Sequence, residues 1–478
     1  MAGRVVRFCK DHPLATPFGV ALAVRLIASI VAIAGVHGYL IPDEVQYVEL
    51  GGVAAAGHLG PHFWSGYGES LFHEAASFMW PLTVLFWLFG AHVVLAAAWA
   101  AIFGALTAAL AALLVSRMAS RGWAVAAGLV VALFPSQVLW SSVVLRESMV
   151  WATLAAIAYG IWLLAGAKGW ASLSTGMAFV AVPLLTVAFL RVWVFLAAAW
   201  AVALAVWLFR PARPVIVRGF CVLIMVLMPL LPGLGLAGAD YVHKSGGNLG
   251  YERTVLSIGA KSAIGHPKII HTPVANPKTV HTPATKPPTT KPPSGHPTTT
   301  TTAATTTTTQ SGTSIIPAGG PDAYYLAHNG LGSDLRALTP GLIAFLLRPF
   351  PWQHGGGVGL DLAAVEEFLY YPLYVLAIVG LVAYRKRRDM LAFPFLVTGF
   401  IAGIGALVEG NVGSAFRHRD QFLWAVVLFA TLGTRYLYER WKARRTGTAR
   451  NAAEEEALSR NSPGSLGHRP VTVNQAGR

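Results

Sequence analysis

The sequence predicts an all-helical polytopic membrane protein, and two observations support this prediction. Hydrophobic residues make up 55% of the 478-residue chain, and charged residues make up only 12%, against about 25% in ordinary soluble domains. Apolar runs of membrane-spanning length, about 20 residues each, recur along the chain. Together these features exclude a soluble, fibrous or disordered protein.

Ten apolar runs are long enough to be expected transmembrane helices. They are 17–38, 92–116, 122–145, 147–166, 171–190, 192–209, 219–238, 365–384, 391–408 and 421–438. The run at 77–90 is shorter, and counting it as an eleventh span would place basic loops on both sides of the membrane. We therefore expect about ten spans plus a juxtamembrane helix lying on the outer surface.

The distribution of charge predicts the orientation of these spans. The net charge of +15 would favour nucleic-acid binding in a soluble protein, but the basic residues lie between the apolar runs. With ten spans, 22 basic and six acidic residues fall in the cytoplasm, and 13 basic and 15 acidic residues fall outside, with Arg25 in the membrane. We therefore expect a multi-pass plasma (inner) membrane protein with both termini cytoplasmic and no nucleic-acid partner. Cleavage of the first span as a signal peptide is the alternative, but its apolar region is longer than the usual one.

Four regions follow from this topology. An N-terminal transmembrane module, 1–238, contains a first outer loop at 39–91, and an extracytoplasmic segment follows at 239–364. Within that segment, 265–315 holds nine prolines at 265–297 and ten threonines among the twelve residues 298–309, a composition that predicts an extended, solvated stalk. C-terminal transmembrane helices at 365–438 and a cytoplasmic tail at 439–478 complete the chain.

The first candidate site is the acidic pair Asp43 and Glu44, which follows the first span. Two adjacent carboxylates repel each other, and this repulsion can raise one pKa into the range of a general base. Tyr47 lies one helical turn further on and is a candidate substrate-binding residue. Asp43 could equally serve as the N-cap of a helix, and a capping aspartate can still act as a base.

Other ionisable residues lie further along the first outer loop and at the outer ends of later spans. Glu69 and His73 are four residues apart, so a helix would place them on one face, where they could contact substrate or bind a divalent metal. Arg146 and Glu147 form a charged pair between two spans, with Glu147 a third catalytic candidate. Arg191 stands alone between two apolar runs, and its plainer interpretation is a basic side chain that reaches the interface.

The loop at 409–420 is the strongest anion-binding candidate. Its basic residues Arg417 and Arg419 lie outside, against the positive-inside trend, so they need another explanation. Arginine binds phosphate in a bidentate manner, and a lipid phosphate would lie at this depth. Asn411 and His418 lie beside the arginines and complete the expected substrate-binding set.

Taken in order, the motifs of the first 170 residues resemble the GT-C superfamily of membrane glycosyltransferases, particularly its bacterial family-39-like members. The motifs are the acidic PDEVQY, the run WPLTVLFWLFG, the small-residue helix AAIFGALTAALAALL and the proline-containing LFPSQVLWSSVVLRE. The chain departs from the family where Met79-Trp80-Pro81-Leu82 replaces a His-Pro-Pro-Leu run. The resemblance implies a GT-C-like fold and an acidic residue of the first outer loop as catalytic base.

The resemblance also implies an activity, which the expected topology supports. Such an enzyme moves a sugar from a polyprenyl-phosphate donor to a glycan, lipid or protein acceptor at the outer face of the membrane, in cell-envelope glycan assembly. The inner loops are too short for a nucleotide-binding domain, which agrees with a lipid-linked donor. No cofactor is required, although a divalent metal remains an option at Glu69 and His73.

Three other functions remain open. A polysaccharide polymerase or ligase would share the lipid-linked substrate and the outer arginines. A transporter of lipid-linked sugars would carry ionisable residues deep within several spans, and Arg25 is the only such residue that the expected spans contain. A non-enzymatic scaffold would present the threonine-rich stalk.

Overall fold

The computed structural model confirms a helical protein. It describes residues 12–36, 42–58, 72, 74–209, 211, 213–227, 331–352, 358–408 and 412–445. Helices are the only regular elements in these ranges. The predicted stalk at 265–315 lies outside the described residues.

The helices of the N-terminal part are α2 (Ala15–Val36), α3 (Pro42–Ala55), α6 (Ala76–Phe89), α7 (Val93–Ser116), α8 (Arg121–Leu133), α9 (Pro135–Ser142), α10 (Glu147–Gly166), α11 (Trp170–Ala188), α12 (Val192–Leu208) and α13 (Pro214–Leu227). Those of the C-terminal part are α17 (Leu331–Leu347), α18 (Val358–Ala383), α19 (Arg388–Val408), α20 (Val412–Arg419), the 3-10 turn η1 (Asp420–Phe422) and α21 (Leu423–Arg445).

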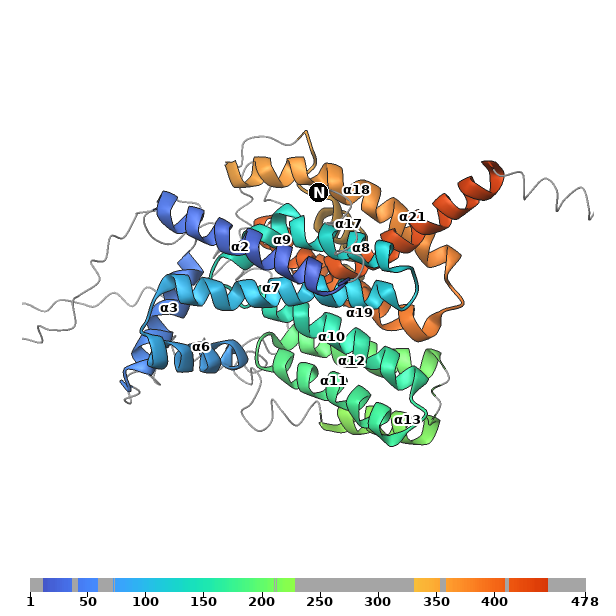
Figure 1. Cartoon of the computed structure of the whole chain (residues 1–478), viewed down its shortest axis with the longest axis horizontal. Coiled ribbons are helices and arrows are strands. Elements are labelled where there is room, and N and C mark those ends of the chain that lie inside the picture. Colours follow the sequence, from blue (N-terminus) through green and yellow to red (C-terminus); the bar gives the residue numbers. More distant parts are fainter. Residues whose placement is uncertain are drawn as a thin grey trace, which may run out of the picture.

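The long helices form a bundle in which segments distant in sequence pack together. Helix α7 packs against both α2 and α8, and α10 packs against α11 (Figure 1). The C-terminal helices join the same bundle, because α18 packs along α21, α19 packs on α12, and α21 reaches α7 and α8. Residues of the N-terminal and C-terminal helices therefore lie close enough to one another to build a common site.

Small residues allow the closest of these contacts. Gly380 of α18 faces Gly433 of α21, and a Cβ on Gly433 would lie 2.0 Å from the carbonyl oxygen of Leu376. A Cβ on Gly380 would lie equally close to the carbonyl oxygen of Phe429. Only glycine permits this backbone approach, the kind of contact that brings membrane helices together.

The expected count of about ten spans is not met in the described part of the chain. Six helices there are long and apolar enough to cross a membrane, or seven if α8 and α9 are one bent span. The predicted span 122–145 is broken by a 56° bend before Pro135, and α12 and the described part of α13 are too short to qualify. Helix α21 carries Arg435, Glu439 and Arg440 in its second half. Apolar composition alone does not reveal such bends and shortenings.

The run at 77–90 does form a short apolar helix, α6, as expected. Its inward face packs against α3 through side chains such as Phe78, Leu82 and Phe86, whereas Trp80 and Trp87 are exposed. Exposed tryptophans are typical of membrane interfaces. Its placement on the outer surface stays a prediction.

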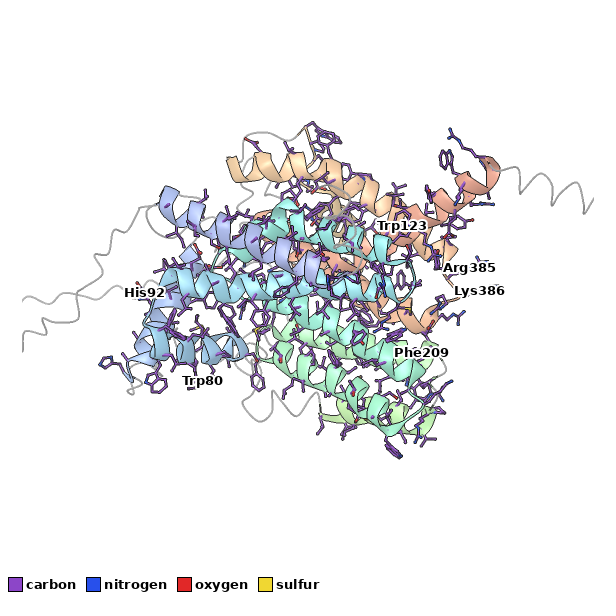
Figure 2. All side chains as sticks on the ribbon, in the orientation of Figure 1. Trp80, His92, Trp123, Phe209, Arg385 and Lys386 are labelled. Carbon is purple, nitrogen blue, oxygen red and sulfur yellow. The ribbon has the colours of Figure 1, made fainter. Side chains whose placement is uncertain are left out.

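The two ends of the bundle differ in character. Arg385, Lys386, Phe209 and Trp123 gather at one end, and His92 and Trp80 lie at the other (Figure 2). The guanidinium of Arg435 donates a hydrogen bond to the carbonyl oxygen of Met118, which brings α21 to the first of these ends. Arg385, Lys386 and the basic second half of α21 therefore lie at the same end of the bundle, while the assignment of that end to the cytoplasm stays a prediction.

Candidate functional site

Four segments distant in sequence meet at the end of the bundle opposite the basic loops. They are the start of α3, the start of α10, the turn before α12, and the end of α20. Together they form a group that we call the arginine–carboxylate cluster, and its members are Asp43, Glu147, Arg191, Arg417 and His418.

Glu147 lies at the centre of this cluster. Its side chain is 1% exposed, and its Oε1 accepts a hydrogen bond of 2.7 Å from Nη2 of Arg191. The same oxygen lies 3.3 Å from Nε of Arg417. Because Glu147 is the first residue of α10, the helix dipole also favours its negative charge. A buried carboxylate held by two arginines is suited to positioning them and poorly suited to proton transfer.

Asp43 and Arg417 form the open side of the cluster. Nη1 of Arg417 donates to Oδ2 of Asp43 at 3.0 Å, and the exposed fractions of the two side chains are 20% and 49%. Burial opposes the charge of Arg417, but Glu147 and then Asp43 outweigh it and raise the pKa of the guanidinium. The arginine therefore remains cationic beside a carboxylate that solvent or substrate can reach.

The neighbouring Glu44 has a different role. It is buried, and its Oε1 accepts a hydrogen bond of 2.9 Å from the backbone N–H of Val144. Both carboxylates start α3, so their side chains point in different directions around the helix. Of the adjacent pair, Glu44 is a buried structural contact, and Asp43 is the carboxylate that solvent can reach.

Arg191 connects the cluster to α20. Its Nη1 contacts Nε2 of His418, and its guanidinium lies 5.7 Å from the ring of Trp193, which packs edge-on against His418. Burial lowers the pKa of Arg191 to about 10, although Glu147 opposes this effect. The side chain is therefore still cationic at neutral pH. It serves as a buried member of the cluster and is not a surface residue.

Arg146 and Tyr47 line the back of the cluster. Nη1 of Arg146 donates to the carbonyl oxygen of Glu74 at 3.3 Å, and the ring of Tyr47 is buried edge-on against Phe78 with centroids 5.5 Å apart. Burial, only partly offset by Arg146, raises the pKa of Tyr47. Tyr47 is thus a packed phenol, and we expect it to support the site from behind.

Arg419 does not join Arg417. Two residues along a helix correspond to a rotation of about 200°, so the two side chains leave α20 on nearly opposite faces. The guanidinium of Arg419 is fully buried, pairs with Glu367, and donates at 2.8 Å to the carbonyl oxygen of Leu346. The expectation that both arginines reach one phosphate does not fit this arrangement.

Arg419 belongs instead to a second group that the sequence did not reveal, which we call the buried acid cluster. Its members are Ser136, Glu366, Glu367, Tyr370, Arg419 and Asp420. Asp420 lies in η1, outside the helices that qualify as spans, and burial followed by the charge of Glu366 raises its pKa to about 8. The sequence signal was the pair of glutamates inside an apolar run at 363–383, which is unusual in a membrane helix.

Three candidate residues, Glu69, His73 and Asn411, lie outside the described residues. Within the part of the chain that the structure describes, no three His, Cys, Asp or Glu side chains come together in a way that could hold a metal. The metal option at Glu69 and His73 therefore stays a prediction.

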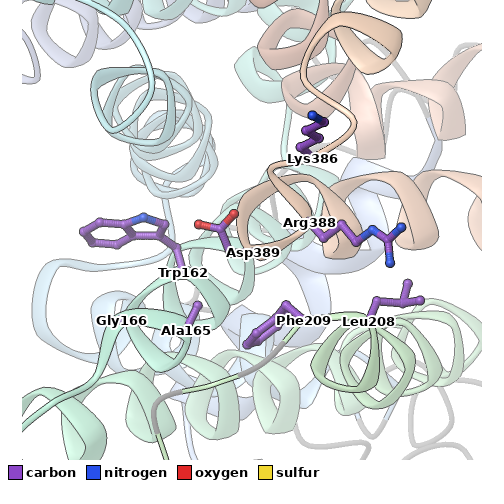
Figure 3. Close-up of a pocket in the computed structure, with 8 residues that line it drawn as sticks. All are labelled: Trp162, Ala165, Gly166, Leu208, Phe209, Lys386, Arg388 and Asp389. Atoms are coloured by element: carbon purple, nitrogen blue, oxygen red, sulfur yellow. The ribbon is translucent and has the colours of Figure 1, made fainter. Parts of the chain in front are cut away.

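A pocket of about 460 Å³ opens at the basic end of the bundle, away from both clusters (Figure 3). It lies between the ends of α10 and α12 and the start of α19, and it is lined by Trp162, Ala165, Gly166, Leu208, Phe209, Lys386, Arg388 and Asp389. None of the candidate site residues lines it.

No family model, curated protein or solved structure matches this chain. We therefore infer the function from the chemistry of the site.

Proposed function

We propose that the protein is a membrane glycosyltransferase that moves a sugar from a polyprenyl-phosphate donor to an acceptor at the outer face of the membrane. The observation that supports this proposal most directly is the Asp43–Arg417 pair. It combines an accessible carboxylate with a cation fixed by a second, buried carboxylate. Transfer of a sugar from a lipid phosphate to a hydroxyl can use both groups. The carboxylate takes the proton of the attacking hydroxyl, and the cation compensates the charge on the departing phosphate.

In the proposed reaction, the free oxygen of Asp43 accepts the proton of the acceptor hydroxyl. The hydroxyl oxygen forms a bond to the anomeric carbon as the bond from that carbon to the phosphate oxygen breaks. The phosphate leaves with the electron pair, and Arg417 compensates the charge that develops on it. No further reactant is needed to balance this step.

The buried members of the cluster keep Arg417 in position. Glu147 fixes its guanidinium, and Arg191 with His418 holds Glu147 from the other side. Preorganised charges of this kind contribute more than mobile ones, because they need not reorient when the transition state forms. We assign Glu147 and Arg191 as positioning residues and Asp43 as the base.

The proposal is tested with purified protein in lipid nanodiscs, labelled polyprenyl-phosphate sugars and an extract of cell-envelope acceptors. Asp43→Asn should lower turnover by about 10²–10⁴-fold, the usual contribution of a positioned base. Glu49→Gln, an exposed change on the same helix, is the matched control. No transfer by the parental protein with any donor, or unchanged turnover in Asp43→Asn, would refute the assignment. Products carrying many added units would instead support a polymerase.

Transport of lipid-linked sugars is the second candidate, and one observation favours it. Glu366 and Glu367 are buried charges inside a membrane-spanning helix, accompanied by the buried Arg419. Such residues often mark transport pathways. Proteoliposomes with a fluorescent lipid-linked sugar in one leaflet separate the two functions, because a transporter would move the lipid without cleaving the sugar.

A further inference from the structure

The buried acid cluster contains more negative than positive charge. Glu366, Glu367 and Asp420 are each less than 5% exposed. Arg419 is the guanidinium that contacts this group, and it pairs with Glu367. Compensation of the negative charges of Glu366 and Asp420 must therefore come from cations that lie further away.

Ser136 connects these two remaining carboxyl groups. Its backbone N–H donates to Oε1 of Glu366 at 3.0 Å, and its hydroxyl donates to Oδ1 of Asp420 at 2.8 Å. Because Ser136 touches both, the two carboxyl groups lie close together around one residue. Two negative charges this close inside a low-dielectric interior repel strongly.

The hydrogen bonds around Asp420 are uneven. The hydroxyl of Tyr370 donates to Oδ1 at 2.7 Å, so Oδ1 accepts two hydrogen bonds, while the buried Oδ2 has no partner within the described chain. The amide of Gln137 donates to the backbone carbonyl of Asp420 at 2.9 Å, and its own oxygen, also fully buried, lacks a donor. Two buried oxygens on adjacent groups thus lack the proton donor that buried acceptors normally have.

One other cation lies nearby in the described part of the chain, and even with its charge included the group keeps an excess of one negative charge. Arg25 of α2 is the next cation, but its nitrogens donate to Ser141 Oγ at 2.6 Å and to the carbonyl oxygen of Ala132 at 2.8 Å. The titratable groups that interact with the pair from the packed elements are Glu367, Tyr370 and Tyr374 of α18, Arg419 of α20 and Arg25 of α2.

With both carboxyl groups ionised, the charges of Glu366, Glu367 and Asp420 would exceed those of Arg419 and Arg25 by one. An uncompensated charge in a protein interior is costly, and the usual response is to bind a proton or another cation. The described residues offer no arrangement of three metal ligands here. A proton requires no such arrangement and supplies the missing hydrogen-bond donor.

We propose that Glu366 and Asp420 form a proton-binding site in which the two carboxyl groups share one proton across Ser136. This site lies outside the arginine–carboxylate cluster and does not rest on the proposed glycosyl transfer. Chain continuity couples it to that cluster, because Asp420 directly follows the segment that carries Arg417 and His418. Loss of the proton would leave two repelling carboxylates and displace η1, and with it the end of α20.

The test is infrared spectroscopy of the full-length protein in phosphatidylcholine nanodiscs, because a protonated carboxyl group has a carbonyl stretch distinct from that of a carboxylate. The parental protein should show one such buried band near neutral pH, which disappears as the pH rises. Asp420→Asn and Glu366→Gln should each abolish it, because removing either charge allows the remaining carboxyl group to ionise. Asp361→Asn, an exposed change on α18, should leave it unchanged.

Two outcomes would overturn the proton site. One is a parental spectrum without a buried carboxyl band near neutral pH, a result that does not depend on the folding of any variant. The other is a band that survives in both folded variants. The coupling is tested by hydrogen exchange at 412–422, which should rise as the band disappears in the parental protein and remain constant in Glu366→Gln. Exchange that does not follow the band would refute the coupling.

Discussion

Glu147→Gln offers the most direct test of how the arginine–carboxylate cluster is held together. The substitution keeps the shape of the side chain and removes the negative charge that Arg191 and Arg417 share, at 2.7 and 3.3 Å. At an effective dielectric constant of about 20, each contact corresponds to a Coulomb attraction of roughly 5–6 kcal/mol before desolvation. Breaking a buried pair on one side typically costs about 3–5 kcal/mol, because the partner charge stays buried and unpaired.

We therefore expect Glu147→Gln to lower the free energy of unfolding by about 3–5 kcal/mol, measured by denaturant titration in mixed micelles. Adding Arg191→Gln should recover part of this loss, because the second substitution removes one of the stranded cations. Glu49→Gln, an exposed change on α3, should alter stability by less than about 0.5 kcal/mol.

A folded Glu147→Gln protein with parental stability would refute this reasoning. It would mean that solvent reaches the guanidinium groups and that the cluster is not preorganised. A double variant whose loss of unfolding free energy exceeds the sum of the losses in the two single variants would also contradict it. The charges of Glu147 and Arg191 would then not be paired with each other.

Four further predictions concern other parts of the chain. Arg417→Ala should weaken donor binding by about 1.5–3 kcal/mol, measured by titration with lipid-linked sugar, and Arg417→Lys should restore it only in part because the bidentate fork is missing. Deleting 265–315 should preserve turnover in membranes. Gly433→Leu should reduce the yield of folded protein on size exclusion, because its Cβ alone would meet a backbone oxygen at 2.0 Å. The melting temperature of the parental protein should fall as the pH rises towards about 8, the raised pKa of Asp420, and Asp420→Asn should flatten this dependence, because a proton bound only in the folded state stabilises it at lower pH.

Each of these predictions has a contrary outcome. Unchanged donor affinity in Arg417→Ala would reduce that residue to a structural contact. Loss of turnover with normal expression after the deletion would mean that the stalk binds substrate. A well-folded Gly433→Leu protein would show that α18 and α21 can separate. A parental melting temperature that rises with pH over this range would contradict a shared proton at Asp420.

The sequence predicted the membership of the arginine–carboxylate cluster better than its roles. Asp43, Glu147, Arg191 and Arg417 stood out because each is an ionisable residue at the end of an apolar run, a place where charge is conspicuous. Such residues gather at the same end of a helical bundle whenever the helices pack side by side. Burial then distinguishes them, and burial depends on packing between helices that no single segment reveals.

The buried acid cluster escaped prediction for the same reason. The glutamates at 366 and 367 lie at the start of an expected span, and Arg419 lies two residues from Arg417 in the same expected loop. Only the rotation of α20 about its axis and the packing of α18 against α21 turn these residues inward. The bend before Pro135 is likewise not evident from apolar composition, although proline inside an apolar run is the residue type at which helices kink.

The order of residues in 417–420 links the two clusters physically. Arg417 and His418 belong to the arginine–carboxylate cluster, and the next two residues belong to the buried acid cluster. A single short segment therefore has its side chains fixed at both sites. Any displacement of η1 must be transmitted to Arg417 within one helical turn, because three backbone units leave little slack. If Arg417 compensates the charge of the leaving phosphate, the protonation of Glu366 and Asp420 then determines how rigidly the guanidinium of Arg417 is positioned. A change of pH at the buried pair would accordingly alter turnover without touching any group that contacts the sugar.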